Sequence, residues 1–142
     1  MTYAGWLKGL DTGKAGDDAR RLIKEVQLEA KLHDRVTTLS GGERRRLGLA
    51  EALTGRCDAV LLDEPTAGLD PQQRSVFLDV LGGLSVDVLM STHQITDVAA
   101  QFEDVHVLRR GRVLWSGTVA ELRDLGDGDA KAGYLRLMQG QQ

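Results

Sequence analysis

Apolar and polar residues alternate along the chain with spacings that change from helical to strand-like and back. Residues 17–32 carry apolar residues at helical spacing among charged ones, which predicts an amphipathic helix. A second helix is predicted over residues 41–53, because Ser40 and Glu43 have the spacing of a capping box at a helix start. The first third of the chain is therefore expected to be helical.

Short apolar runs then predict strands. Residues 59–62 are wholly apolar and end at Asp63-Glu64-Pro65, which favours a parallel strand buried on both faces. A helix is expected to follow Pro71, and residues 86–90 form a second apolar run that leads into Ser91-Thr92-His93. This alternation predicts an α/β fold with a mainly parallel sheet, in which ligands bind beyond the carboxyl ends of the strands.

The last third of the chain predicts smaller elements. A short helix over residues 95–102 precedes a hairpin formed by residues 105–108 and 113–115. Thr118 and Glu121 have the spacing of another capping box. After a stretch rich in glycine and aspartate, the tail becomes apolar again and is expected to form a small docking helix.

Composition and charge narrow the class of protein. The chain has 142 residues, of which 42% are hydrophobic and 27% are charged, as expected for one globular domain. The net charge of -3 provides no broad attraction to nucleic acid or anionic lipid. Because no apolar run approaches the roughly 20 residues that span a bilayer, we expect a cytoplasmic protein without nucleic acid as a partner.

Two adjacent carboxylates at a strand end suit nucleotide hydrolysis. One acid can hold Mg²⁺ while the other positions and deprotonates water, and Asp63 and Glu64 fit those two tasks. Ser40, Gly41 and Gly42 open a predicted helix, whose unpaired N–H groups and dipole form a site for an anion. Taken alone, the acids could be a solvated turn and Ser40 an ordinary helix cap.

Three segments in this order resemble the motifs of one family. LSGGERRRLGLAEAL, AVLLDEPTAGLD and STH are similar to the signature, Walker B with D-loop, and H-loop motifs of ATP-binding cassette (ABC) ATPases. The resemblance covers nearly the whole chain. The stretches GLDPQQR and RRGRVLWSGTVAEL resemble most closely the cassettes of bacterial ABC-2 type exporters, so the resemblance implies a subunit that couples ATP hydrolysis to transport, in particular export.

The resemblance implies a role for each matching residue. Asp63 would hold Mg²⁺ through water, Glu64 would polarise the attacking water, and His93 would contact the γ-phosphate of ATP. Ser40, Gly41 and Gly42 would close over the ATP held by a second cassette, and Asp70 would link the two sites across the dimer.

The resemblance also implies partners and a layout. The second cassette would make a homo- or heterodimer, and a membrane permease would hold the protein at the inner face of the cell membrane, its one link to the membrane. The implied fold is a partial P-loop NTPase (ABC ATPase) fold, with a helical signature subdomain over residues 1–55, part of the ATPase core over 56–125 and a tail over 126–142.

The chain departs from the family at one place above all. No G-x-x-x-x-G-K-[ST] motif occurs, and the nearest segment, residues 9–15, is one residue short and ends in alanine. We therefore expect the C-terminal part of a cassette that lacks the Walker A strand, so that the remaining sheet has a gap and uncovered apolar surface. Such a chain should be inactive alone. The alternative is a non-catalytic fragment that pairs with and regulates a complete cassette.

Two smaller departures concern the signature helix. Glu43 stands where the family commonly has glutamine, so its side chain is expected to serve the capping box. Arg44, Arg45 and Arg46 follow on one helical turn and are expected to form a solvated or subunit-facing surface.

Overall fold

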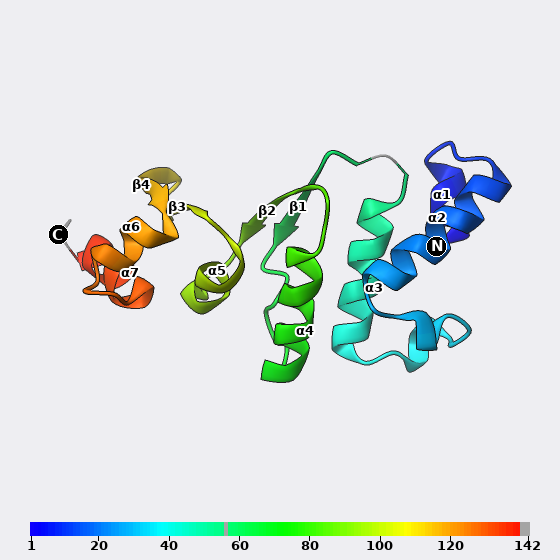
Figure 1. Ribbon diagram of the computed structural model, residues 1–142, viewed down its shortest axis with the longest axis horizontal. Coiled ribbons are helices and arrows are strands. Elements are labelled where there is room, and N and C mark those ends of the chain that lie inside the picture. The colour runs from blue at the N-terminus through cyan, green and yellow to red at the C-terminus, as the bar shows by residue number, and fades with distance from the viewer. Residues whose placement is uncertain (56, 140–142) are drawn as a thin grey trace. The chain divides into compact units, whose positions relative to one another are not determined.

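The computed structural model describes residues 1–55 and 57–139, and its elements can be followed by colour in Figure 1. The chain divides into two compact units, Met1–Ser91 and Thr92–Gln142. The first unit contains α1 (Thr2–Leu7), α2 (Thr12–Glu25), the 3₁₀ turns η1 (Glu29–Lys31) and η2 (Val36–Thr38), α3 (Gly41–Leu53), β1 (Ala59–Asp63), α4 (Pro71–Gly82) and β2 (Asp87–Ser91). The second contains α5 (Ile95–Gln101), β3 (Asp104–Arg109), β4 (Arg112–Thr118), α6 (Val119–Asp124) and α7 (Ala130–Gln139). The subdomain division predicted from the sequence stays a prediction.

The first long helix lies earlier in the chain than its predicted range of 17–32. α2 begins after Asp11, whose carboxylate accepts a hydrogen bond from the backbone N–H of Lys14 at 3.0 Å. It ends before Gln27, which has a φ of 56° in the left-handed region. Apolar residues continue at helical spacing past Gln27, but there they belong to a turn and to η1. The helix ends where the backbone conformation changes, and the spacing of side chains does not mark that place.

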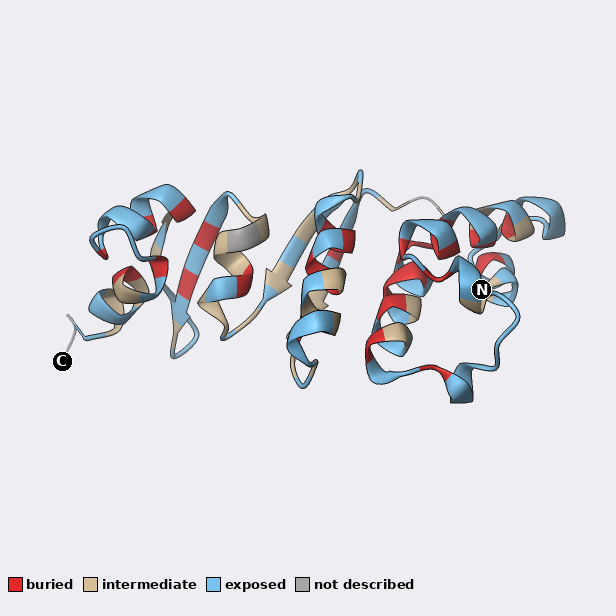
Figure 2. Ribbon diagram, turned by 60° about the horizontal axis from the view of Figure 1, so that its bottom comes forward, coloured by how far each residue is buried: buried red, intermediate tan, exposed pale blue. Residues whose placement is uncertain are grey.

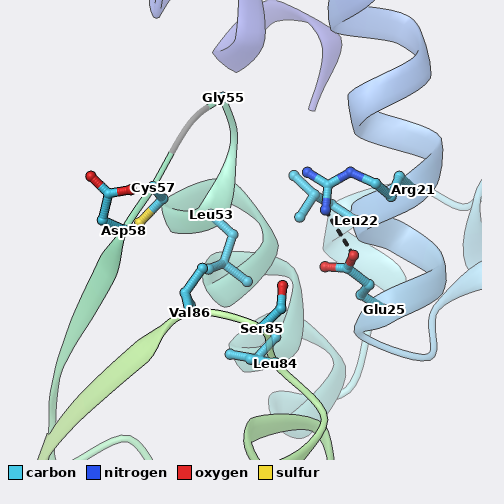
Figure 3. Close-up of a pocket in the computed structure, with 10 residues that line it drawn as sticks. All are labelled: Arg21, Leu22, Glu25, Leu53, Gly55, Cys57, Asp58, Leu84, Ser85 and Val86. Atoms are coloured by element: carbon cyan, nitrogen blue, oxygen red, sulfur yellow. Dashed lines mark hydrogen bonds and ion pairs between the residues drawn. The ribbon is translucent and has the colours of Figure 1, made fainter.

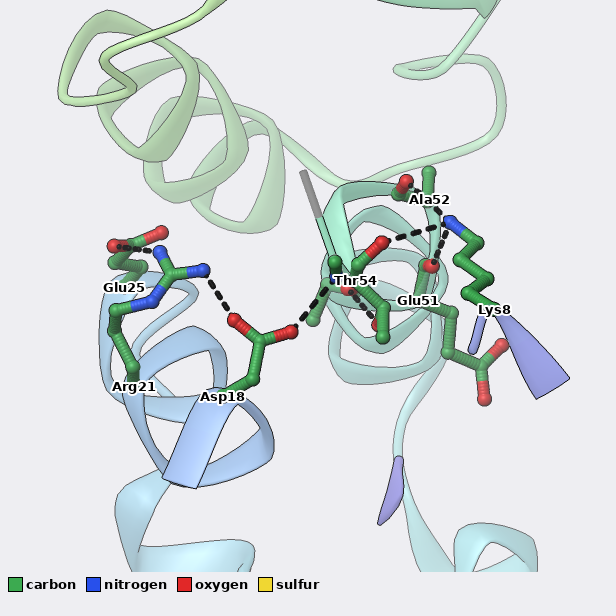
Figure 4. A network of polar contacts seen from close by, with 9 residues as sticks. Lys8, Asp18, Arg21, Glu25, Glu51, Ala52 and Thr54 are labelled. Carbon is green, nitrogen blue, oxygen red and sulfur yellow. Dashed lines mark hydrogen bonds and ion pairs between the residues drawn. The ribbon is translucent and has the colours of Figure 1, made fainter. Parts of the chain in front are cut away.

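The helix α3 spans the predicted residues 41–53, and its last turn is held by two other helices (Figure 4). Lys8, at the end of α1, donates from Nζ to the carbonyl oxygens of Glu51, Ala52 and Thr54 at 3.3, 3.0 and 3.1 Å. Asp18 of α2 accepts a hydrogen bond from the N–H of Gly55 at 2.8 Å. Lys8 thus binds carbonyl groups at the helix end, where carbonyls lack intrahelical partners, and Asp18 binds the N–H that follows them.

The strands β1 and β2 pair in parallel, as predicted, with Leu61 opposite Leu89 and Asp63 opposite Ser91. The expectation that this strand is buried on both faces is wrong. Val60 is only 4% exposed, but Leu61 is 75% exposed and Leu89 is 61% exposed. Alternate residues of a strand point to opposite faces, and the burial colours of Figure 2 alternate accordingly along both strands. One face of this pair is therefore uncovered apolar surface in the described chain.

The second unit is built on the antiparallel pair β3–β4, whose register shifts between Val107 and Leu108. The predicted capping box of Thr118 and Glu121 is present and begins α6. The predicted tail helix is α7, and its apolar residues pack against the buried core of this unit. That core comprises Val105, Val107, Val119, Leu122 and Ala130, with Tyr134, Leu137 and Met138 of α7 packed against it.

The strand pairings of the described residues form two separate sheets, β1–β2 and β3–β4. The predicted α/β class is confirmed, and so is parallel pairing for the first sheet. The gap that a missing Walker A strand would leave stays a prediction, because the two sheets belong to different compact units.

Candidate functional site

The acidic pair lies at the carboxyl end of β1. Asp63 is the last residue of the strand and is exposed, and Glu64 follows it and is partly buried. The parallel register brings Ser91, the last residue of β2, beside Asp63. The carboxyl ends of both strands therefore present polar side chains at one edge of the sheet, where ligands of α/β proteins bind.

Ser91 connects the two acidic residues. Its hydroxyl donates a hydrogen bond to Oδ1 of Asp63. The N–H of Glu64 in turn donates to the backbone carbonyl of Ser91 and to its hydroxyl oxygen, both at 3.1 Å. Sequence reasoning did not select Ser91 as a site residue, although the expectation that the two strands pair in parallel, with their ends level, would have found it.

Glu64 has an unusual backbone conformation. Its φ is 44°, in the left-handed region that residues other than glycine seldom adopt, and Pro65 follows it. Such a conformation costs about 1–3 kcal/mol and persists where the surroundings hold it, often at functional sites. The two hydrogen bonds from the Glu64 N–H to Ser91 are such a restraint, so the turn after β1 is fixed by β2.

The signature segment lies at the N-terminus of the 13-residue helix α3. The Ser40 hydroxyl accepts a hydrogen bond from the Glu43 N–H at 3.2 Å, and the Glu43 carboxylate accepts one from the Ser40 N–H at 2.7 Å. This second bond lowers the pKa of Glu43 below its ordinary value. The capping role expected for Glu43 is confirmed. Ser40 and Gly41 are exposed, whereas Gly42 is buried.

Of the three arginines expected to form a solvated or subunit-facing surface, Arg44 and Arg45 are exposed and Arg46 is buried. Arg46 is only 6% exposed, and its Nε donates to the carbonyl oxygen of Val26 at 3.1 Å. Burial lowers the pKa of its guanidinium. Arg44 and Arg45 are exposed, but each donates to a backbone carbonyl, that of Leu39 and that of Ala67 respectively. The guanidinium groups therefore connect α3 to its surroundings. The prediction is wrong for Arg46, because helix packing decides which of the three is buried.

A pocket of about 230 Å³ lies between α3 and the end of β1. Asp63 and Pro65 line it from the strand end, and Arg44 and Arg45 line it from the helix. The acid at the strand end and the cations of the signature helix thus share one hollow of the first unit.

The remaining predicted site residues have separate positions. Asp70 begins α4 as its N-cap, and its carboxylate accepts a hydrogen bond from the Gln73 N–H at 2.9 Å. His93 is exposed and lies in the second compact unit, whereas the acids, the signature segment and Asp70 lie in the first. The structure therefore brings together Asp63, Glu64 and Ser91, and the role expected for His93 stays a prediction.

Magnesium is compatible with the residues at this strand end. The described residues contain no cluster of three or more histidine, cysteine, aspartate or glutamate side chains placed to hold a metal ion. Mg²⁺ at phosphate sites needs only one or two carboxylates, because phosphate oxygens and water supply the other ligands. Asp63 is an exposed carboxylate with one oxygen held by Ser91, which fits that requirement.

A second hollow, of about 240 Å³, lies at the opposite end of the same strands (Figure 3). Cys57 and Asp58, which precede β1, line it together with Val86, which precedes β2, and with Arg21 and Glu25 of α2. Because this pocket lies at the amino ends of the strands, it is not the position where the fold binds a ligand.

Comparisons with known proteins agree with the motifs. The family described as ABC transporter matches residues 5–67. The uncharacterized ABC transporter ATP-binding protein YxlF of Bacillus subtilis (strain 168) is 35% identical over 125 residues, which is 87% of this chain and 42% of that protein. The phosphonates import ATP-binding protein PhnC of Hyphomonas neptunium is 43% identical over 112 residues, which is 75% of this chain and 42% of that protein.

A solved structure extends the likeness to the fold. The structure of cbiO1 from Clostridium perfringens, described as part of the ABC transporter complex cbiONQ, has a TM-score of 0.77 at 25% identity and covers 94% of this chain and 58% of that chain.

The chain spans less than half the length of the curated relatives YxlF and PhnC. None of the helices in the described part of the chain has the length and apolar character needed to cross a membrane. On its motifs, its fold and these likenesses, the chain belongs to the family of ABC transporter ATP-binding proteins.

Proposed function

We propose that this chain acts in an ATPase unit that drives a membrane transporter, and that it does so together with a second cassette. ATP binding and hydrolysis are properties of its family. The proposal covers transport in general and not export in particular, because the relatives include a protein named for phosphonate import. A permease partner, and a position at the inner face of the membrane through that permease, are part of the proposal.

The observation that carries the proposal is the pairing of two strand ends. Asp63 has one oxygen held by the Ser91 hydroxyl, and the N–H of Glu64 is held by Ser91 as well. In the proposed mechanism Asp63 holds Mg²⁺ through water and Glu64 orients and polarises the attacking water. Phosphoryl transfer depends mainly on such positioning and on charge stabilisation, so two acids fixed by a third residue suit the reaction. Mg²⁺ would supply neutralisation of the charge on the phosphate oxygens.

The proposed role of the signature segment is to bind the nucleotide of the other cassette. Ser40 and Gly41 are exposed at the start of a long helix, and Gly42 follows them. Their N–H groups and the positive end of the helix dipole favour a phosphate. Asp70 would connect the two nucleotide sites across the dimer, and His93 would contact the γ-phosphate. Residues 1–142 carry no Walker A motif, so we propose that by themselves they do not turn over ATP.

Complementation in a mixed pair tests this proposal. The partner is full-length YxlF in which the residue that aligns with Ser40 is replaced by arginine, so that it is inactive alone. Added to this partner and Mg·ATP, the present chain should restore hydrolysis, because its own signature segment would close over the partner's ATP. Ser40→Arg should abolish the restored activity, since the large cation occupies the position of the phosphate. Ser75→Arg, which makes the same change at an exposed serine of α4, is the matched control.

The outcomes separate the possibilities. Failure to restore hydrolysis, or restoration that survives Ser40→Arg, contradicts the proposed role of the signature segment. ATP hydrolysis by the purified chain alone contradicts the need for a second cassette.

The second candidate function is a regulator of a complete cassette, favoured by the uncovered face at Leu61 and Leu89. In that case the chain changes the activity of unaltered YxlF, and Leu61→Thr with Leu89→Thr weakens that effect more than Ser40→Arg does.

A further inference from the structure

Gln73 lies where two segments of the first unit meet, the turn that carries Asp70 and the signature helix. It belongs to the first turn of α4 and is partly buried, whereas its neighbour Gln72 is exposed. Its backbone N–H donates to the carboxylate of Asp70 at 2.9 Å, and its side-chain oxygen accepts a hydrogen bond from Nη1 of Arg46 at 3.0 Å. One residue therefore contacts both the D-loop aspartate and the signature helix.

The side chain of Gln73 also lies directly against the signature backbone. A Cβ atom added to Gly42 would be 2.7 Å from Cδ of Gln73 and 2.9 Å from its Cβ. Real Cβ atoms essentially never approach other atoms so closely, so any side chain at position 42 would displace Gln73. At Gly41, by contrast, an added Cβ meets nothing within 4 Å. A side chain at position 42 therefore requires Gln73 to move, whereas a side chain at position 41 does not.

Arg46 makes this contact rigid. Its side chain is buried and is held from a second direction, because Nε donates to the Val26 carbonyl at the end of α2. A buried guanidinium group needs its hydrogen bonds, since unpaired burial of a charge is costly. Arg45 adds a parallel connection from α3 to the segment after β1, through the carbonyl oxygen of Ala67 at 3.1 Å.

We infer that Gln73 is a positioning residue that couples the signature segment, Ser40 to Gly42, to Asp70 of the same chain. When the signature backbone shifts, Gln73 has to shift with it, because its side chain fills the space beside Gly42 and is bonded to Arg46. The turn that carries Asp70 is bonded to the same residue and moves too. The consequence for ATP use rests on the proposed function, in which both segments act at the boundary between two cassettes. The coupling itself does not depend on that function.

A double-mutant cycle with Gly42→Ala and Gln73→Ala measures the coupling in the purified chain without nucleotide. Gly42→Ala should raise the equilibrium constant of unfolding of the first unit roughly tenfold, as overpacking does. The effect should be smaller in the Gln73→Ala background, because Cδ and the amide oxygen are removed and only the contact with the Cβ of residue 73 remains. The pair Gly41→Ala and Gln73→Ala is the matched control and should be additive within experimental error.

Backbone NMR supplies a measurement that loss of stability alone does not change. Gly42→Ala should shift the amide signals of Asp70 and Gln73 in the otherwise unaltered chain, and it should shift the Asp70 signal far less when residue 73 is alanine. Gln73→Glu keeps the acceptor for Arg46, so Gly42→Ala should still shift the Asp70 signal in this background. Gln72→Ala is the control and should also leave that shift unchanged. Additive stabilities in the Gly42 cycle, or an Asp70 shift that is the same with and without Gln73, would overturn the inference. Because no ATP is present, neither result bears on the proposed function.

Discussion

Replacement of Lys8 by methionine tests how the signature helix is held at its far end. The Lys8 ammonium group donates to three carbonyl oxygens in and just after the last turn of α3, at 3.0–3.3 Å. Methionine keeps a flexible apolar stem of similar length but has no donor and no charge. The substitution therefore removes these hydrogen bonds while disturbing packing little.

The size of the expected loss of stability depends on how exposed the hydrogen bonds of Lys8 are. A cation at a helix C-terminus contributes about 0.3–1 kcal/mol when it is exposed and up to about 2 kcal/mol when it is partly buried. The bond to the Thr54 carbonyl is partly buried, and the bonds to Glu51 and Ala52 are exposed. We therefore expect Lys8→Met to lower the free energy of unfolding of the first unit by about 1–2 kcal/mol.

Urea unfolding followed by tryptophan fluorescence measures this change. Trp115→Phe is introduced in all variants, so that Trp6 in α1 is the single reporter and only the first unit is observed. Lys14→Met is the control, because Lys14 makes an exposed ion pair with Asp11, in which the side chains are 77% and 60% exposed. Exposed pairs of this kind contribute little to stability, because water and salt screen them. If Lys8→Met and Lys14→Met shift the urea midpoint equally, the carbonyl contacts of Lys8 do not stabilise the fold and the reasoning is refuted.

Three further predictions concern other parts of the chain. The pKa of Glu43 is lowered in the folded state, so the stability contributed by its carboxylate is present above the ordinary pKa of 4.5 and is lost as the pH falls through the lower folded pKa. In acid titrations followed by circular dichroism, Glu43→Gln should therefore flatten the fall in stability over that pH range. A slope equal to that of the unaltered chain would contradict this. Gly133→Ala should destabilise the second unit by about 1–3 kcal/mol in thermal unfolding, because its Cβ would lie 3.0 Å from a backbone carbonyl carbon of α6. Gly16→Ala in α2, where an added Cβ meets nothing within 4 Å, should not destabilise the first unit. Leu61→Thr combined with Leu89→Thr should reduce self-association in sedimentation velocity, because these side chains are 75% and 61% exposed, and unchanged association would show that this face is not adhesive.

The fold was predicted best where structure depends on near neighbours in the sequence. The capping boxes at Ser40 and Thr118 were predicted at their observed positions, since a cap is made by residues three positions apart. The short apolar runs gave both strands of the first sheet within one residue. The predicted range of the first long helix extends too far, because the left-handed conformation of Gln27 ends the helix and no glycine or proline marks that place in the sequence.

The candidate site was predicted in part. The positions of Asp63 and Glu64 after a strand, and of Ser40 at a helix start, follow from local pattern. Their chemical roles came from the resemblance to the family and stay proposals. Ser91 was not selected, because its relation to Asp63 spans 28 positions in the chain and exists only through the register of two paired strands.

By itself the sequence determined the two parallel strands, the hairpin after them, the caps at Ser40 and Thr118 and the motifs that identify the family, because each is encoded within a few consecutive residues. Tertiary structure alone decided that Arg46 is buried while its two neighbours are exposed, that Gln73 fills the space beside Gly42, and that Leu61 lies on an uncovered face. These properties depend on which elements pack against one another, and hydrophobic spacing states only that a residue prefers burial, not which surface will cover it.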